Sequence, residues 1–245
     1  MKDNKTLALL GCDAPSRICE SLASLGFKVI LLPRDERLQL PVRSHADMLL
    51  GVIKNDIFCS EKYFIENRDI FNAIEAYGYT VTTCKAELSQ KYPQDIAFNM
   101  LFVGNSIIGK IDFIAEEIKE YAQRNKIELL RVKQGYSKCS TLLLGDDAII
   151  CADDGIISEA ERINLSTLKI ENSHDAITLQ GYGYGFIGGA SGVFGKNVYF
   201  AGNIDLHPQV KKIAEFLTKF GFDAISLCED KLCDVGGIIF LPPLL

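Results

Sequence analysis

The residues best suited to catalysis in this sequence are a histidine, an aspartate and two cysteines. His45 and Asp47 are separated by one residue, so a strand would place both side chains on the same face, because strand side chains alternate. A carboxylate beside an imidazole can fix its tautomer and raise its pKa. Such a pair could activate Cys139 or Cys233 as a thiolate nucleophile. The alternative is that His45 makes structural hydrogen bonds at a strand edge and that Cys139 lies in the core.

Other polar residues stand at or just before apolar runs that indicate buried strands. Because several strand starts can converge on one pocket, we expect these side chains to bind a ligand. Lys138 cannot be buried alone at low cost, so it should face water, a carboxylate or an anionic ligand. The candidate ligand-binding residues are Arg43, Asn99, Gln134, Tyr136, Lys138, Ser191 and Asp234.

A repeated pattern accounts for the positions of these residues: an apolar run, a tight turn and a second apolar run. The turns are rich in Gly, Asn and Asp, which supply the positive φ that hairpins need. The four complete hairpins span residues 46–59, 99–109, 140–151 and 191–201. A fifth run, residues 236–241, has no second strand after it, so residues 6–11 at the other end of the chain can pair with it.

Helical patterns alternate with the hairpins and carry apolar residues at three- and four-residue spacing. They cover residues 16–25, 66–77, 113–124, 155–163 and 209–220. Each leads to another apolar run, at residues 28–32, 80–82, 128–132, 176–179 and 224–227. The sequence therefore predicts an α/β fold in a single domain, residues 1–245, with five ββαβ units closed into a ring. An open doubly wound sheet is the alternative, but tight hairpins favour antiparallel pairs.

Three short segments add to this pattern: Gly-Gly-Ile-Ile-Phe at 236–240, Gly-Gly-Ala at 188–190 and Tyr-Ser-Lys at 136–138. Together with the five units they resemble the pentein superfamily, the five-bladed α/β propellers of guanidine-modifying enzymes. In those proteins the corresponding segments are the final active-site strand, a Glu-Gly-Gly-Asp motif and a His-x-Asp or His-x-Lys motif. The superfamily includes arginine deiminases, dimethylargininases, amidinotransferases and the non-enzymatic ribosome anti-association factors. The chain most resembles an uncharacterised bacterial branch, which implies a propeller with pseudo-fivefold symmetry.

The residues that work in those enzymes are replaced here at several positions. The resemblance places Phe240 at the position of the nucleophile and Tyr136 at the position of the general acid–base. It places Ile187 and Ala190 at the positions of the acidic pair. Only Asp47 matches a family carboxylate. The resemblance therefore implies that conventional Cys-His guanidine hydrolysis is lost, unless a shift of register brings Cys233 to the nucleophile position.

Composition narrows the class of protein further. The 245-residue chain is 48% hydrophobic and carries a formal net charge of −6, which indicates a folded protein and argues against a nucleic-acid partner. No apolar run reaches the ~18 residues of a membrane span, so we expect no membrane partner. None of the eight cysteines forms Cys-x-x-Cys, so we expect no metal, no cofactor and a reducing, cytoplasmic location. The Gly-x-Gly-x-x-Gly pattern at residues 183–188 lacks the following helix of a dinucleotide site.

Three functions remain open at this stage. The first is a pentein-like protein that binds a small polar molecule in its central channel without the family's covalent chemistry. The second is a divergent C–N hydrolase or amidinotransferase, acting on an amidine or guanidine with a rebuilt Cys-His-Asp site. The third is a ring-shaped protein-interaction module, for which an acidic composition disfavours an RNA-facing role.

Overall fold

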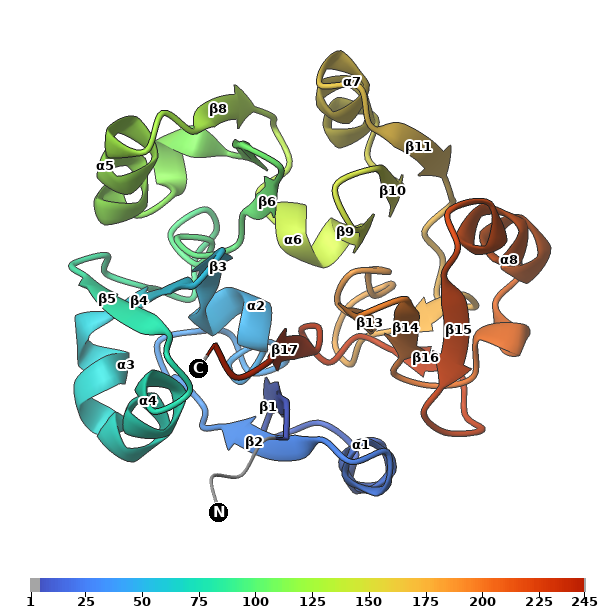
Figure 1. The fold of residues 1–245 in the computed structure, drawn as a ribbon, viewed down its shortest axis with the longest axis horizontal. Coiled ribbons are helices and arrows are strands. Elements are labelled where there is room, and N and C mark those ends of the chain that lie inside the picture. The colour runs from blue at the N-terminus through green and yellow to red at the C-terminus, as the bar shows by residue number, and fades with distance from the viewer. Residues whose placement is uncertain (1–4, 245) are drawn as a thin grey trace.

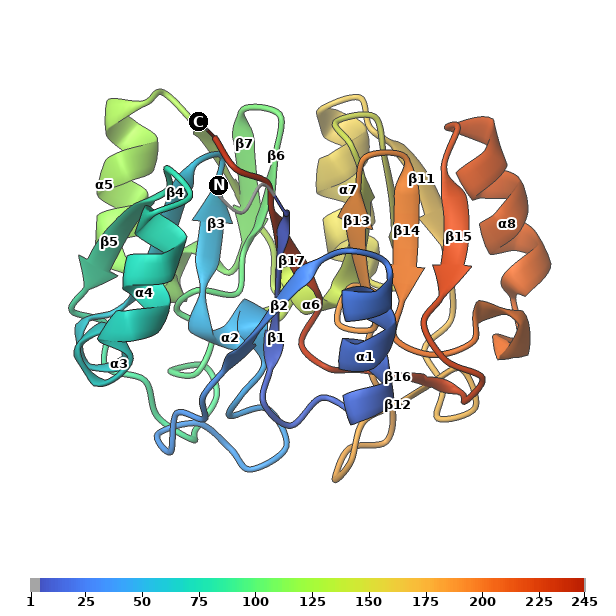
Figure 2. The ribbon, with the colours of Figure 1, turned by 60° about the horizontal axis from the view of Figure 1, so that its bottom comes forward.

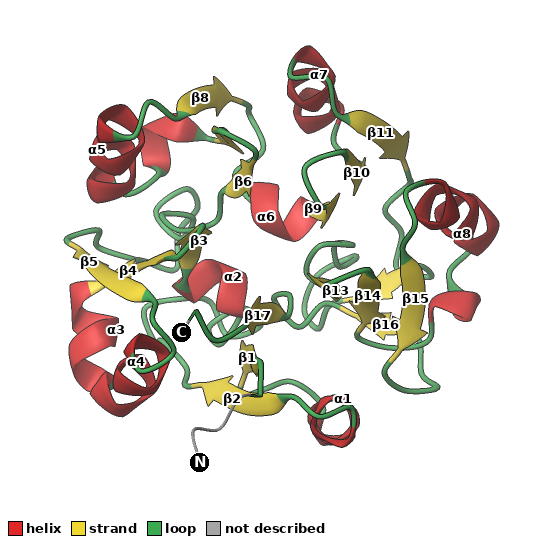
Figure 3. Ribbon diagram, viewed as in Figure 1, coloured by secondary structure: helices red, strands yellow, loops and turns green. Residues whose placement is uncertain are grey.

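The computed structural model describes residues 5–244, which form a mixed α/β structure (Figure 1). Within this part of the chain the strands form five separate three-stranded sheets and one two-stranded sheet. The three-stranded sheets surround the centre of the molecule, and the longer helices lie outside them (Figure 3). The α/β class predicted from the sequence is confirmed.

Four of the three-stranded sheets are built from consecutive segments with the same topology. Two antiparallel strands form a hairpin, and a third strand, which follows a helix, pairs in parallel with the second. Gly104, Gly145 and Gly195 take φ of 57°, 62° and 62° in the turns, where a side chain would be strained. The sheets are β3 (Gly51–Ile53), β4 (Asp56–Ser60) and β5 (Thr80–Cys84); β6 (Leu101–Val103), β7 (Ser106–Gly109) and β8 (Glu128–Arg131); β9 (Thr141–Leu144), β10 (Ala148–Cys151) and β11 (Ser166–Lys169); and β13 (Ser191–Phe194), β14 (Asn197–Phe200) and β15 (Asp223–Ser226).

The fifth sheet joins the two ends of the described chain. Strand β1 (Leu7–Gly11) pairs in parallel with β2 (Lys28–Leu32) and antiparallel with β17 (Ile239–Leu241), so that Leu7 faces Leu241 in the register. This confirms that residues 6–11 supply the missing partner of the last apolar run. The order β17-β1-β2 repeats the hairpin-plus-parallel-strand topology of the other four sheets.

The longer helices connect the second and third strands of the units and bury one apolar face. Helix α1 places Ile18 and Leu22 against Ala8 and Leu10 of β1, and all four side chains are fully buried. Ser60 and Asp153 cap the helices that follow them by accepting hydrogen bonds from backbone N–H groups. These helices are α1 (Ser16–Ser24), α3 (Glu61–Glu66), α4 (Arg68–Glu75), α5 (Glu116–Arg124), α7 (Asp154–Arg162) and α8 (Val210–Lys219), and single 3-10 turns lie at Ile111–Phe113 and Ile204–Leu206.

Two short helical turns replace segments that the sequence predicts as strand starts. They are α2 (Ala46–Leu49) and α6 (Ser137–Ser140), which lead directly into β3 and β9. Figure 2 shows both turns at the end of the molecule where these first strands begin. The prediction that residues 45–47 form a strand is therefore wrong.

Residues 176–179, which the sequence predicts as a third strand beside β10, lie in a different sheet. The third strand of the β10 unit is β11, not residues 176–179, because the chain leaves α7 through Asn164, at φ 65°, and returns at once beside β10. Residues 177–178 instead form β12 (Ile177–Thr178), which pairs in parallel with β16 (Leu232–Cys233). This small sheet fixes the segment that carries Asp234, whose backbone N–H donates to the Thr178 carbonyl at 2.9 Å.

Candidate functional site

Two cavities lie along the centre of the molecule, and α2 and α6 contribute residues to both. The mouth pocket has a volume of about 240 Å³ and is lined by Val42, His45, Met48, Tyr136, Cys139, Leu179, Tyr182, Gly183, Tyr184, Phe186 and Asp234. The channel cavity has a volume of about 210 Å³ and is lined by residues of the first strands of all five units together with Asp47, Lys138 and Ser191. Because α2 and α6 face both spaces, they separate one from the other.

His45 and Asp234 form the polar end of the mouth pocket. His45 Nδ1 lies 3.7 Å from Asp234 Oδ1, and both side chains are buried. The Asp234 carboxylate also accepts backbone hydrogen bonds from Phe186, at 2.9 Å, and from Gly236, at 3.0 Å. Burial raises the pKa of the Asp234 carboxyl, the His45 imidazole acts in the opposite direction, and nearby Asp47 raises it further.

Glycines allow the backbone to approach this pair closely. A Cβ on Gly189 would lie 2.1 Å from Asp234 Oδ1, and a Cβ on Gly236 would lie 2.3 Å from the His45 Cβ. The Gly189 carbonyl accepts hydrogen bonds from the N–H groups of Val235 and Gly237, while its own N–H donates to the Cys139 carbonyl. The segment at 188–190 therefore ties α6 to the residues before β17.

Asn99 holds Cys139 at the inner wall of the pocket. Its side-chain amide donates to the Cys139 Sγ at 2.9 Å, and its carbonyl oxygen accepts from the N–H groups of Lys138 and Cys139. Burial raises the pKa of the Cys139 thiol well above its ordinary value, and the charges of Asp47 and Asp234 raise it further. The Asp47 carboxylate therefore lies beside this thiol. These surroundings do not support the proposed thiolate at Cys139.

Tyr136 is hydrogen-bonded to Asp95, a carboxylate that no sequence pattern indicates. Its hydroxyl donates to Asp95 Oδ2 at 2.7 Å, and the second oxygen of this buried carboxylate has no hydrogen-bond partner within residues 5–244. Burial and the hydrogen bond to Asp95 raise the pKa of the Tyr136 phenol. Burial raises the pKa of Asp95, and the bond from Tyr136 offsets part of that effect. The position that the resemblance assigns to a general acid–base therefore carries a protonated phenol.

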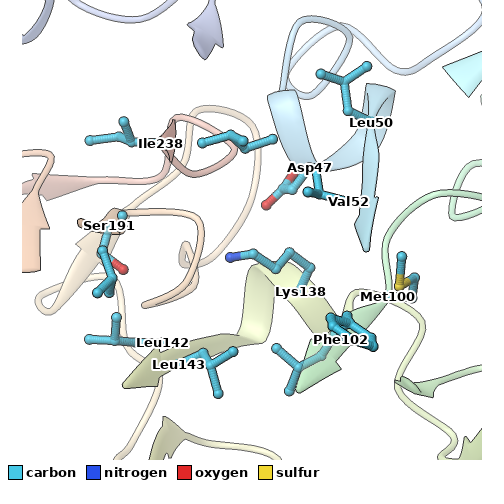
Figure 4. Close-up of a pocket in the computed structure, with 14 residues that line it drawn as sticks. Asp47, Leu50, Val52, Met100, Phe102, Lys138, Leu142, Leu143, Ser191 and Ile238 are labelled. Carbon is cyan, nitrogen blue, oxygen red and sulfur yellow. The ribbon is translucent and has the colours of Figure 1, made fainter. Parts of the chain in front are cut away.

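Asp47 lines the channel cavity rather than the mouth pocket. Only 1% of the residue is exposed, and neither carboxylate oxygen has a hydrogen-bond partner in the described part of the chain. The Lys138 side chain extends toward it across the cavity (Figure 4). Ser191 also lines this cavity, and its hydroxyl donates to the Ile187 carbonyl at 2.7 Å.

The helical turn explains why His45 and Asp47 do not share a face. His45 precedes α2 as its N-cap residue and Asp47 lies in the first turn. Because the chain turns by about 100° per residue there, the alternation of a strand does not apply to these two side chains. His45 and Asp47 therefore do not line the same cavity, although Asp47 lies beside Lys138 and Cys139 of the expected segment 136–139. His45, Tyr136, Cys139 and Asp234 come together at the mouth pocket, whereas Asp47, Lys138 and Ser191 come together at the channel cavity.

The remaining predicted residues lie outside both cavities. Arg43 forms an ion pair with Glu36 at 2.8 Å and, like Cys233, lines an outer groove of about 600 Å³ beside the mouth pocket. Burial raises the pKa of the Cys233 thiol to about 11. Gln134 accepts a hydrogen bond from the Tyr136 backbone and thus shapes the turn before α6.

Phe240 occupies an apolar contact between sheets. Its ring lies 4.8 Å from that of Phe27, 5.1 Å from Tyr199 and 5.7 Å from Phe194, measured between centroids. Such contacts are typical of an aromatic core. Ile187 and Ala190, at the positions of the acidic pair, are also buried apolar residues.

Residues 5–244 contain no cluster of three or more His, Cys, Asp or Glu side chains that could hold a metal ion. In the same part of the chain, no helix has the length and apolar character that crossing a membrane requires.

The comparison with protein families decides the family of this chain. Residues 9–239 match DUF6873, a family of unknown function. The chain belongs to DUF6873. A sequence comparison of this DUF6873 protein with curated proteins gives no match.

Solved structures show what fold the DUF6873 chain has. A DDAH from Pseudomonas aeruginosa, in complex with citrulline, superimposes with a TM-score of 0.57 at 11% identity and covers 98% of each chain. The amidinotransferase SxtG of Microseira wollei gives 0.53 at 12% identity, covering 91% of this chain and 88% of its own. The N-terminal domain of ArgZ, a cyanobacterial arginine dihydrolase, gives 0.54 at 13% identity, covering 96% and 95%. These are pentein proteins, so the resemblance seen in the sequence is confirmed at the level of fold.

Proposed function

We propose that this protein binds a small organic cation in the mouth pocket, where its central channel opens, and that it does so without thiolate chemistry. The observation that carries the proposal is the charge around the pocket. Two buried carboxylates lie at the pocket, Asp234 in its wall and Asp95 hydrogen-bonded to the lining residue Tyr136, whereas His45 is the one basic side chain among the lining residues. A buried negative charge without full compensation is costly, so a cationic ligand would stabilise the site.

The aromatic lining supports the same ligand class. Tyr136, Tyr182, Tyr184 and Phe186 all line the mouth pocket. The Phe186 ring lies 6.4 Å from that of Tyr136 and 5.7 Å from that of Tyr184. Aromatic faces attract cations, and this attraction strengthens when water is excluded. The pocket therefore suits a small ammonium or guanidinium compound with an apolar surface.

The five units support a further statement about the fold. We infer that they are the blades of a propeller related by pseudo-fivefold symmetry, because each three-stranded sheet has the same strand topology. The chain forms a single domain on this reading. All eight cysteines are free thiols, which supports a reducing, cytoplasmic setting. The net charge of −6 supports a small-molecule partner over a nucleic acid.

Ligand-induced thermal stabilisation tests the binding proposal. Choline and agmatine are the probes, and the neutral tert-butyl analogue of choline is the matched control ligand. We expect at least one cation to raise the melting temperature in a concentration-dependent way, and the neutral analogue to have no effect. His45→Ala, Asp234→Asn and Tyr184→Ala should each reduce the shift, whereas Phe113→Ala, which changes an exposed aromatic residue elsewhere, should retain it.

Activity assays test the absence of thiolate chemistry. We expect the purified protein to release no citrulline from arginine or from methylated arginines, because Phe240, Tyr136 and two apolar residues stand at the working positions. Turnover that disappears in a Cys233→Ala variant would show that the register assigned to the last strand is wrong. A neutral analogue that stabilises the protein as well as choline does would overturn the proposed ligand class.

A further inference from the structure

The channel cavity is a second chemical environment, separate from the mouth pocket. Its walls come from all five first strands, including Val52 of β3, Phe102 of β6, Leu142 of β9, Val193 of β13 and Ile239 of β17. These side chains are apolar, and the volume of about 210 Å³ is smaller than the ~300–1,000 Å³ of usual ligand pockets. The cavity therefore favours a small, mainly apolar molecule.

Two opposite charges interrupt this apolar lining. The Asp47 carboxylate is almost fully buried, and both oxygens lack a hydrogen-bond partner among residues 5–244. Its backbone is fixed by a hydrogen bond from its N–H to the Gly236 carbonyl. A buried carboxylate in a cavity wall whose oxygens lack partners would be stabilised by N–H donors from a ligand.

Lys138 faces Asp47 from the opposite element. Its backbone N–H donates to Asn99, which fixes the start of α6, and its side chain extends into the cavity toward the carboxylate (Figure 4). A ligand with only a positive charge would meet the ammonium of Lys138, and a ligand with only a negative charge would meet Asp47. A molecule with both charges close together satisfies the two side chains at once.

We propose that the channel cavity binds a small aliphatic α-amino acid as its zwitterion. The ligand ammonium donates to Asp47, the ligand carboxylate accepts from Lys138, and the aliphatic side chain packs against the strand residues. This site is distinct from the cation site in the mouth pocket, because α2 and α6 direct different side chains into the two spaces.

Isothermal titration and thermal shift with L-leucine as the probe test this site. Two half-ligands separate the charges: isoamylamine lacks the carboxylate, and 4-methylpentanoate lacks the ammonium. We expect leucine to bind and the half-ligands to bind at least about tenfold more weakly, since a lost charged hydrogen bond is worth a factor of this size. L-arginine, with its long charged side chain, should not bind in the cavity.

Matched variants assign the binding to the two charges. Asp47→Asn and Lys138→Gln should each weaken leucine binding at least about tenfold, whereas Asp223→Asn and Lys133→Gln, at exposed positions, should leave it unchanged. Far-ultraviolet circular dichroism confirms that each variant is folded. A failure of choline and agmatine to bind anywhere would contradict the mouth-pocket proposal alone.

Three results would overturn the inference. The first is a folded protein to which leucine, isoleucine, valine and methionine all fail to bind. The second is leucine binding that survives in both Asp47→Asn and Lys138→Gln. The third is a half-ligand that binds as tightly as leucine. In each case Asp47 and Lys138 would be a structural charge pair across the cavity.

Discussion

The thiol of Cys139 is surrounded by groups that keep it protonated. It is buried, it accepts a hydrogen bond from Asn99, and it lies near the carboxylates of Asp47 and Asp234. A reactive cysteine needs the opposite conditions, namely partial exposure and positive charge. The cysteine that sequence spacing suggested as a nucleophile therefore has the chemistry of a core residue.

Alkylation of the native protein tests this description. With iodoacetamide near neutral pH we expect modification of Cys12, which is exposed, and little modification of Cys139 or Cys233. The thiol of Cys233, whose pKa burial raises to about 11, is roughly one thousandth ionised near pH 8. Peptide mass spectrometry measures the site occupancy. Faster modification of Cys139 than of Cys12 would contradict the assignment.

The stability of the folded protein should depend on pH through the carboxyl group of Asp95. Because burial raises its folded-state pKa above the ordinary 3.8, the folded protein holds this proton more tightly than the unfolded chain does. The stabilisation is fully present below the ordinary pKa and is lost as the pH rises through the folded-state pKa. Asp95→Asn does not titrate, so its melting temperature relative to the wild type should increase as the pH rises.

Melting temperatures of both proteins, measured from about pH 4 to about pH 8, provide this comparison. Asp223→Asn, at an exposed carboxylate, is the control and should follow the wild type. An Asp95→Asn curve parallel to that of the wild type would show that Asp95 is ionised in the folded protein throughout this range.

At the scale of elements, the glycine segment before β13 sets the position of Asp234. Gly189→Ala would place a methyl group 2.1 Å from Asp234 Oδ1, so the carboxylate or the segment must move. We expect a loss of about 1–3 kcal/mol in the free energy of unfolding, together with weaker cation binding. Gly183→Ala, in the same loop, meets nothing within 4 Å and should be nearly neutral. Urea unfolding measures both, and equal stability would remove this role from Gly189.

Hydrophobic periodicity was sufficient to predict most of the elements. The predicted strand at 28–32 coincides with β2, and α8 lies within the helix predicted at 209–220. The four-residue turns α2 and α6 were missed because they are too short to show a helical period. Strand β11 was missed because its residues Ser166–Lys169 are only partly buried or exposed and carry a weak apolar signal.

The candidate site was predictable in part, and the limits have physical causes. Sequence patterns selected His45, Tyr136, Cys139 and Asp234, which do line one pocket. They could not show that Asp47 and His45 line different cavities, because the directions of these two side chains depend on the helical turn α2, which was not predicted. They also could not select Asp95, since its partner Tyr136 is 41 residues away and no periodic pattern surrounds it.

At the scale of the whole molecule, the sheet β17-β1-β2 joins both ends of the described chain. Leu7, Leu9 and Leu10 of β1 are fully buried, and each buried leucine contributes about 2–5 kcal/mol. Deleting residues 1–12 removes all three, which is comparable with the ~5–15 kcal/mol stability of a typical domain. We expect this deletion to abolish the cooperative unfolding transition.

Two single substitutions keep that prediction testable if the deleted protein cannot be purified. Leu9→Ala removes a fully buried side chain and should cost about 2–5 kcal/mol, whereas Leu31→Ala, on the neighbouring strand, changes a residue that is 43% exposed. Urea unfolding measures both variants. An unchanged midpoint in the deletion, or equal costs for the two substitutions, would refute the role given to β1.

The pairing of β1 with β17 has a consequence for biosynthesis. A ribosome releases β1 early and β17 only after nearly all of the remaining chain has been made. Until then β1 can pair with β2 along one edge, while its other edge remains unpaired and its leucines lack their contacts with β17. Such an open apolar edge is a site for chaperones and for aggregation. Completion of this fold therefore cannot precede the release of β17, and fragments that lack β17 should expose this edge of β1.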